Sequence, residues 1–237
     1  MSAGDTVRVW DIETGAIQCE LEGSTTAGNA VRVSPDGTLV AAVGQTCGLW
    51  DLYTGDLVAT LAAPTSSANA LGFSANGRFC IAGGDDGAVL IWDLPAASRR
   101  STAPIDERSC GPDLPALPPL APTTHIHGHE AYVGAVCLSA DGSLAASADG
   151  DGMLRLWDVA RAELLSVVRL PAPADSCRIR WNVVIVADTL GGLHLYNIRG
   201  RPSPVPAAAA TRLWRFGAGE ALGAWDEALA IRCVWCE

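Results

Sequence analysis

Short apolar runs alternate with polar turns along most of this chain. In the clearest stretch the apolar runs lie at 132–138, 144–147, 153–157 and 164–170. The runs are rich in β-branched and small residues, and Asp-Gly or Asn-Gly turns separate several of them. This combination is typical of antiparallel hairpins rather than helices. The pattern therefore predicts units of four short strands.

These units repeat with a regular spacing. A second shared element, Ser-x-Asp/Asn-Gly, stands at 34–37, 74–77 and 139–142, ahead of a Gly-rich turn and a Trp-Asp pair. The intervals between successive pairs are 40, 42 and 65 residues, and a degenerate Tyr196-Asn197 follows 39 residues later. The pairs in register are Trp10-Asp11, Trp50-Asp51, Trp92-Asp93 and Trp157-Asp158.

A single four-stranded meander cannot bury both of its faces, so such units stack around an axis as propeller blades. The repeated motifs resemble the WD-repeat (Trp-Asp repeat) β-propeller family, over residues 5 to about 198. We therefore expect an all-β fold: a β-propeller of WD-repeat type with about five four-stranded blades, forming one domain over residues 1–237.

The number of blades is open at this point. The chain begins with the third and fourth strands of a unit, at 6–10 and 16–21, and segments 221–225 and 228–234 resemble the first two strands of another. The two halves could pair and close a five-bladed ring, which would remove exposed sheet edges. Alternatively, the chain is a piece of a larger, seven-bladed propeller.

The resemblance implies a hydrogen-bonded tetrad that ties each blade together. One unit keeps all four positions, at His129, Ser147, Asp151 and Trp157. The other units are degenerate: Asp86 and Trp92 remain in one, with Pro64 in the histidine position, whereas Ser24 and Gly44 replace His and Asp in another. We expect these blades to depend mainly on packing.

The 65-residue interval contains an insert at about 95–122. It holds seven of the fourteen prolines, which favour extended, irregular backbone. We expect a disordered or semi-rigid surface loop. Its PxxP spacings, at 112–115 and 115–118, also fit a short docking peptide.

Composition narrows the function classes. Hydrophobic residues make up 49% of the chain, the formal charge is −10, and all sixteen basic residues are Arg. The acidic charge disfavours nucleic-acid partners.

The eight cysteines are widely spaced, mostly within apolar runs, so we expect reduced, buried thiols. No leader or long apolar run is evident, so we expect a cytoplasmic protein, or a nuclear one, with no membrane partner.

Candidate chemistry is sparse. His125 and His127 alternate along an extended segment and could share a metal, but no further ligand type stands nearby, so we expect them to be polar residues of the outer face. A lone CxxC at 233–236 lacks the second ligand pair of a zinc site, and the Asp-Gly-rich 149–152 turn lacks the later Glu of a calcium loop. No nucleophile–base motif is present, and we expect no cofactor and no catalytic residue.

The function that fits best is a non-catalytic scaffold that docks partner proteins or peptides on a propeller rim. Loops on a rigid frame carry such binding, and the acidic ones, which suit basic partners, contain Asp85, Asp86 and Asp149. We expect a monomer within a multiprotein complex. Two alternatives are a substrate receptor of a cullin-type ubiquitin ligase, through a degenerate Trp-Asp-x-Arg pattern at 196–199, and a metal-dependent enzymatic propeller.

Overall fold

A computed structural model of the chain describes residues 7–21, 28–62, 67–94 and 119–198. Every regular element within these residues is a β-strand, and all strand pairs within the sheets are antiparallel. The all-β propeller architecture predicted from the repeats is confirmed. Among the described residues there is no helix, and hence none that could cross a bilayer.

The strands form five sheets, which we call blades I to V in chain order. Blade I has two strands and blade V three, and the other three have four each. Blade I contains β1 (Val7–Trp10) and β2 (Ile17–Leu21); blade II contains β3 (Ala30–Val33), β4 (Leu39–Val43), β5 (Cys47–Asp51) and β6 (Leu57–Leu61). Blade III contains β7 (Ala68–Phe73), β8 (Phe79–Gly84), β9 (Val89–Asp93) and β10 (Thr124–Ile126). Blade IV contains β11 (Val133–Leu138), β12 (Leu144–Asp149), β13 (Met153–Asp158) and β14 (Glu163–Arg169); blade V contains β15 (Ala174–Arg180), β16 (Val183–Asp188) and β17 (Leu193–Asn197).

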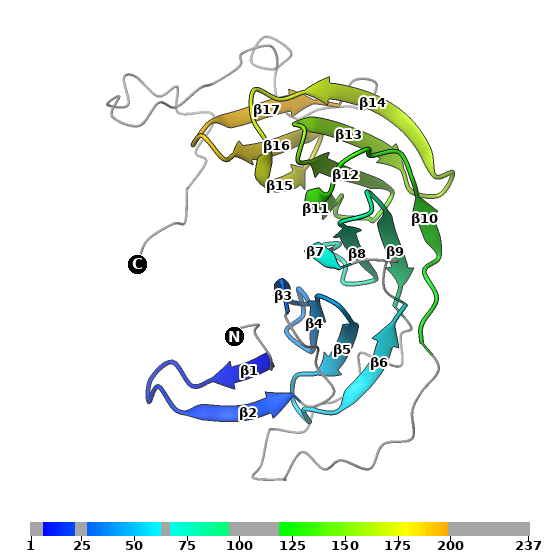
Figure 1. The fold of residues 1–237 in the computed structure, drawn as a ribbon. Helices are drawn as coiled ribbons and strands as arrows, with labels where there is room; N and C mark the ends of the chain where they lie inside the picture. Colours follow the sequence, from blue (N-terminus) through cyan, green and yellow to red (C-terminus); the bar gives the residue numbers. More distant parts are fainter. Residues whose placement is uncertain (1–6, 22–27, 63–66, 95–118, 199–237) are drawn as a thin grey trace.

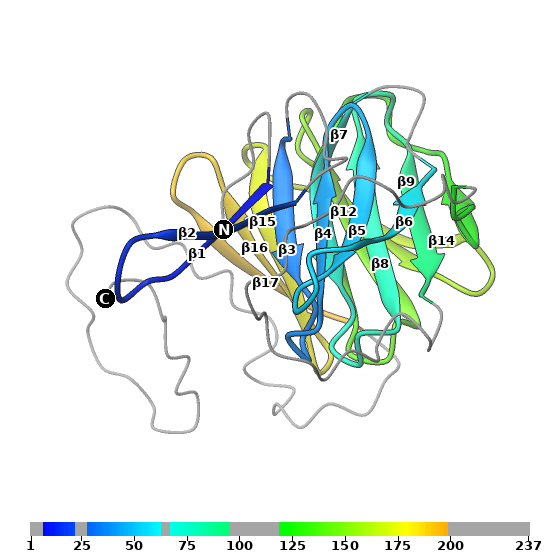
Figure 2. The same ribbon diagram turned by 90° about the horizontal axis from the view of Figure 1, so that it is seen from below.

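The blades stand side by side in an arc, with the first strands of blades II to V toward its centre (Figure 1). Seen from the side, the connecting turns gather at two opposite rims (Figure 2). We call the rim that holds the turns between second and third strands the upper rim. The opposite one, which holds the turns between third and fourth strands, is the lower rim.

Each pair of neighbouring blades encloses its own apolar cluster. The four clusters lie between blades I and II, II and III, III and IV, and IV and V. Strand β12 is buried along its whole length because blades III and V cover its two faces. The middle strands are correspondingly rich in small residues. At Gly83, for example, an added Cβ would collide with Val133 of the next blade, so the sheets approach there to contact distance.

The predicted insert interrupts blade III between its third and fourth strands. Strand β10 pairs with β9, so the chain leaves this blade after Leu94 and returns to complete it. The last residues of the predicted insert, 119–122, lie within the described part of the chain. Leu120 donates its N–H to Thr60 O and accepts from Ala62 N, at 2.7 and 3.0 Å, alongside the outer strand β6 of blade II. Residues 95–118 lie outside the described part of the chain.

The predicted pairing of the two chain ends also concerns residues outside the described part, since 221–225 and 228–234 are not described. The N-terminal segment of that pairing is described: β1 pairs with β2, and Val7, Val9 and Leu21 pack against blade II. In Figure 1 the described strands leave the side of the arc between β1 and β17 open.

We predict that residues 97–118 can be replaced by a short Gly-Ser linker with little change in the thermal midpoint. Loop length contributes only slowly to the entropy of closure, and the blade needs only Leu120 and β10 to return. Extending the replacement through residue 122 should lower the midpoint clearly, because it removes the Leu120 side chain that packs against the apolar cluster between blades II and III and fixes the pairing with β6. Equal midpoints for the two replacements, measured by circular dichroism, would contradict a role for Leu120.

Candidate functional site

The two residues of each Trp-Asp pair have separate roles. The indole rings of Trp50, Trp92 and Trp157 are buried in the interface with the preceding blade. The aspartate that follows closes the next turn; Asp51 Oδ1, for instance, accepts from the backbone N–H groups of residues 53 and 54 at 2.8 and 3.0 Å. Burial of one side chain and turn formation by the next explain why the two residue types recur together.

In the other Trp-Asp pairs, two features differ: the exposure of Trp10, and the contacts of Asp93 and Asp158. Trp10 is 41% exposed, because it lies in the two-stranded blade I, while Asp11 makes the same turn contacts as Asp51. Asp93 forms a two-point ion pair with Arg78, and Asp158 accepts from the N–H of Arg161.

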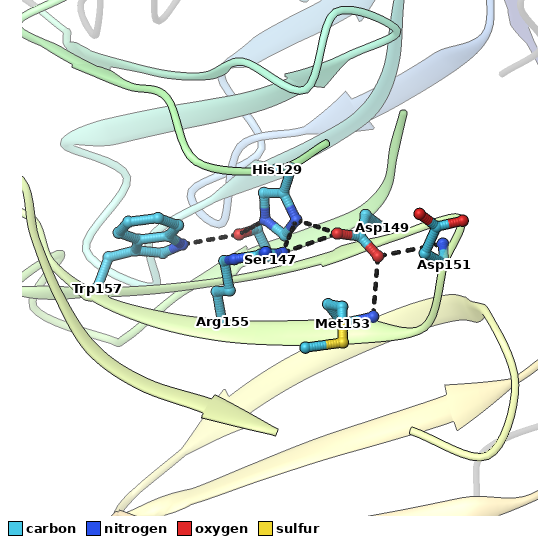
Figure 3. A network of polar contacts seen from close by, with 7 residues as sticks. All are labelled: His129, Ser147, Asp149, Asp151, Met153, Arg155 and Trp157. Carbon is cyan, nitrogen blue, oxygen red and sulfur yellow. Dashed lines mark hydrogen bonds and ion pairs between the residues drawn. The ribbon is translucent and has the colours of Figure 1, made fainter. Parts of the chain in front are cut away.

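Blade IV contains a buried relay of hydrogen bonds (Figure 3). Trp157 Nε1 donates to Ser147 Oγ at 2.7 Å, Ser147 Oγ lies 2.6 Å from His129 Nε2, and His129 Nδ1 lies 2.7 Å from Asp149 Oδ2. A carboxylate only accepts, so His129 Nδ1 donates to Asp149, and Nε2 of the neutral ring accepts from the serine hydroxyl, whose oxygen in turn accepts from the indole N–H. Arg155 Nη1 also lies 2.6 Å from Nδ1, and this donor is satisfied by Asp149 Oδ2. The predicted set is therefore brought together at His129, Ser147 and Trp157.

The carboxylate of the relay is that of Asp149, and the assignment of Asp151 to this position is wrong. Asp149 ends β12, whereas Asp151 lies exposed at the tip of the following turn and contributes only its backbone N–H, 3.1 Å from Asp149 Oδ1. Asp149 also accepts from Met153 N and from Arg155 Nη1, at 2.8 and 2.7 Å. Two acidic residues of one turn are alike in sequence, and only the strand register separates them.

The protonation states within the relay follow from burial and these contacts. Burial lowers the pKa of His129, the positive charge of Arg155 adds to this effect, and both outweigh the attraction of Asp149. Burial alone would raise the pKa of Asp149. The hydrogen bonds from His129, Met153 N and Arg155 outweigh burial and hold that pKa below its ordinary value. The relay therefore contains a neutral imidazole and an ionised carboxylate.

The Ser147–His129–Asp149 arrangement has the connectivity of a nucleophilic triad, but its surroundings do not suit one. Ser147 is fully buried, and its oxygen already accepts from Trp157. The loop before His129 passes close over the indole ring, where a Cβ at Gly128 would meet Trp157 at 2.9 Å. A substrate carbonyl has no approach to the hydroxyl, so this relay satisfies buried polar groups within the fold.

The relay is replaced by packing in blades II and III. The strand register places small residues where blade IV has Ser147 and Asp149: Ala42 and Gly44 in blade II, and Ala82 and Gly84 in blade III. Asp86 therefore corresponds to the exposed Asp151, and the predicted link between Asp86 and Trp92 is also wrong. Instead, Trp92 Nε1 donates to Leu120 O at 3.1 Å. Pro64 and Ser24 lie outside the described residues.

Blade V has a polar pair that the sequence reasoning missed. Asp188 takes the place of Asp149 in the register, and its Oδ2 lies 2.7 Å from Nε2 of the fully buried His194 on β17. Burial of Asp188 is outweighed by this contact and by two backbone N–H groups, so its pKa is lowered. The sequence did contain one signal for this pair: His194 follows Asp188 by six residues, just as Arg155 follows Asp149 in blade IV.

The predicted partner-binding aspartates do not lie together. Asp85 and Asp86 are exposed at the β8–β9 turn of the upper rim, whereas Asp149 is 2% exposed inside the relay and is corrected from a docking residue to a structural one. Its neighbour Asp151 occupies the exposed position instead. The side chain of Asn69 donates to Asp85 Oδ1, which fixes one of these carboxylates on the rim.

The other candidate sites add little chemistry. The rings of His125 and His127 lie 4.0 Å apart, but within the described segments no group of three metal-binding side chains includes them. The 233–236 CxxC and Arg199 of the degenerate receptor pattern lie outside the described residues. The five described cysteines are free thiols, and burial raises the pKa of Cys47 to about 11, so it is an unreactive thiol.

Comparison with known proteins agrees with this geometry. The family model for the WD domain, G-beta repeat, matches residues 55–93 and 120–158. These two segments carry the WD-repeat pattern. The first matched segment contains β6, the outer strand of blade II, and β7 to β9 of blade III. The second contains β10, the outer strand of blade III, and β11 to β13 of blade IV. Each WD repeat here therefore links two blades covalently. The predicted resemblance to the WD-repeat propeller family is confirmed.

Curated relatives cover only part of this chain. The small ribosomal subunit protein RACK1 of Caenorhabditis elegans is 33% identical over 79 residues, which are 33% of this chain and 20% of that protein. RACK1y of Oryza sativa subsp. japonica is 36% identical over 84 residues, 35% of this chain and 22% of that protein. The matches thus span about a fifth of the relatives' length.

A solved structure shares the fold more widely. The crystal structure of RRP9 WD40 repeats superposes with a TM-score of 0.58 and 14% identity, over 74% of this chain and 49% of that one. At this identity the likeness concerns the WD-repeat fold alone.

We predict that Trp157→Ala lowers the free energy of unfolding by about 3–5 kcal/mol, the range for deleting a buried large aromatic side chain. The substitution also leaves Ser147 without its donor. Trp181→Ala is the control, since Trp181 is 73% exposed and its loss should change stability by less than about 0.5 kcal/mol. Similar losses for both variants in denaturant titrations would contradict the relay's role in stability.

We also predict that stability falls as the pH is lowered from about 7.5 to 5.5. The unfolded chain binds a proton on His129 near its ordinary pKa of about 6.5, whereas the folded relay resists it, so acidification favours the unfolded state. At lower pH a further loss follows, because the pKa of Asp149 is depressed in the fold.

His129→Gln should reduce the loss between these two pH values, with a remainder from His125, whose pKa is lowered by its partial burial and by His127. His127→Gln, at an exposed position, should retain most of the loss. Thermal midpoints at both pH values provide the measurement. An unchanged pH dependence in His129→Gln would refute the protonation states assigned to the relay.

Proposed function

We propose that this WD-repeat chain is a non-catalytic scaffold that docks basic segments of partner proteins on its upper rim. The observation that carries the proposal is the set of exposed carboxylates at the loops of this rim, on neighbouring blades: Asp85, Asp86, Glu130 and Asp151. Loops on packed sheets present such charges with little freedom to move.

Hydrogen bonds between side chains support the idea that part of this rim is preorganised. Asn29 Nδ2 donates to Asn69 Oδ1 at 3.0 Å, and Asn69 in turn donates to Asp85. This chain of amides crosses from blade II to blade III. Because Asp85 is held in place, a partner loses less of the binding free energy in ordering it.

The family adds support of a general kind. The curated relatives are named as proteins of the small ribosomal subunit, which is a multicomponent assembly. By analogy, we propose that this chain acts as a monomer within a larger protein complex, in the cytoplasm. An acidic rim suits Arg- or Lys-rich peptides and disfavours nucleic acid.

The proposal is tested by the binding of a short Arg-rich peptide to the full chain, measured by fluorescence anisotropy. The triple variant Asp85→Asn, Asp86→Asn, Asp151→Asn should weaken binding roughly tenfold, since each exposed ion pair contributes about 0.5 kcal/mol. Asparagine keeps the oxygen that accepts from Ala88 N at position 86, so the turn is preserved.

The matched control removes three charges from lower-rim turns, in the variant Glu13→Gln, Asp56→Asn, Glu163→Gln. All three residues are exposed. This control should bind the peptide nearly as well as the unchanged chain. If both triple variants lose affinity equally, the peptide responds only to the net charge, and docking on the upper rim is wrong.

A further inference from the structure

The outer strand of blade IV, β14, presents apolar side chains to solvent. Leu164, Leu165 and Val167 are 47%, 50% and 42% exposed, and six of the seven residues in the strand are exposed. The outer strand of blade II differs, because every residue of β6 is half-buried or buried. Exposed apolar groups that gather on one element are typical of a surface that a partner covers.

The backbone of β14 also has a free edge. The strand is the last of its sheet and pairs with β13 on one side only, whereas its other side lies at the outside of the arc (Figure 1). No described strand pairs with that side. Such an edge offers N–H and C=O groups to any extended segment that lies alongside it.

Blade II shows how this chain covers an outer edge. Leu120 forms a parallel bridge with Leu61 beside β6, donates its N–H to Thr60 O and accepts from Ala62 N. Its side chain packs against the apolar cluster between blades II and III. One extended apolar segment thus pairs with the backbone of an outer strand and covers its side chains. No described segment does the same for β14.

The two ends of β14 carry opposite charges. Glu163 begins the strand and Arg169 ends it, both are exposed, and neither forms an ion pair with another described residue. An antiparallel segment, the more stable arrangement, would place its first residue opposite Arg169 and its last opposite Glu163. Opposite charges at facing positions stabilise a strand pair and like charges destabilise it. The edge therefore suits a segment that begins with an acidic residue and ends with a basic one.

The shape of this edge favours a flexible segment over β14 of a second copy. The register with β13 shifts between Leu156 and Trp157, so β14 contains Leu165 as an extra residue. Such a bulge bends the strand and hinders two rigid edges from pairing along their whole length. One pair of seven-residue strands would also bury far less than the roughly 1,600 Å² of a typical stable interface. An unstructured segment can follow the bend.

We propose that β14 accepts an extended segment of a partner protein as a fifth, antiparallel strand of blade IV. The segment has an acidic residue opposite Arg169, alternating apolar residues along the strand, and a basic residue opposite Glu163. Backbone pairing supplies affinity in this mode of binding, and the side chains select the sequence. The proposal goes beyond docking on the upper rim, because it involves a different surface and requires apolar contacts.

The test measures the binding of three labelled, terminally capped peptides to the full chain by fluorescence anisotropy. The first is Asp-Val-Thr-Val-Thr-Val-Arg, and the second has its Asp and Arg exchanged. We expect the first to bind about fivefold or more tightly, because the exchange places like charges at both ends. The third has Pro at positions four and five, loses a ladder N–H in either register, and should not bind measurably. Equal or reversed affinities of the first two peptides, or no binding by either, would overturn the proposal.

Variants of β14 locate the segment. The double variant Glu163→Arg, Arg169→Glu should reverse the preference between the first two peptides, a result that lost stability cannot produce. Leu164→Lys with Val167→Lys should abolish binding but leave the thermal midpoint nearly unchanged, since both side chains are exposed. Ile17→Lys, at a 46% exposed position on the outer strand β2, is the matched control and should bind the first peptide normally.

Two further outcomes would assign other occupants or another surface. Self-association of the full chain in light scattering that the Leu164→Lys, Val167→Lys variant removes would give the edge to a second copy and overturn the proposal. The upper-rim triple variant should bind the first peptide as tightly as the unchanged chain, whatever its effect on the Arg-rich peptide. Loss of binding in that variant would place the peptide on the rim and refute pairing with β14.

Discussion

The architecture depends on one constraint: a small four-stranded sheet with two apolar faces is stable only when neighbours cover both. Strand β12 shows the constraint most clearly, since every residue in it is buried between blades III and V. Because each interface is filled by side chains from two blades, small residues such as Gly83 are required where the sheets approach most closely. Stacking by this rule turns the first strands of blades II to V inward and leaves the loops on two rims, so the position of the acidic rim follows from it.

Hydrogen bonding takes a different form from blade to blade, although the packing rule is constant. Blade IV buries a neutral His129 against an ionised Asp149, an arrangement that needs every donor matched. Blade V achieves part of the same result with His194 and Asp188, whereas blade III has Ala82 and Gly84 at the equivalent places. Removing both partners of a buried polar contact leaves no unsatisfied group, which explains how the degenerate repeats keep the fold.

Charge is distributed in a way that the net value of −10 conceals. Carboxylates of the second-to-third-strand turns project from the upper rim, while Arg32 and Arg178 lie on the innermost strands β3 and β15. The same turns also contain Asp149, whose carboxylate is directed into the sheet. A single acidic loop thus stabilises the fold through Asp149 and exposes Asp151 to solvent on the proposed docking rim.

The sequence by itself determined the all-β class and the repeat, because these depend on local turn chemistry and on the period of apolar runs. It also predicted that His129 and Ser147 contribute to the same blade as Trp157. Only the tertiary structure decided that Asp149 rather than Asp151 completes the relay, since a shift of register, invisible in an Asp-Gly-rich turn, sets which carboxylate faces inward. The return of Leu120 to blade II was likewise out of reach. It joins residues that are far apart in the chain, and no local pattern records a contact that exists only once the blades have packed.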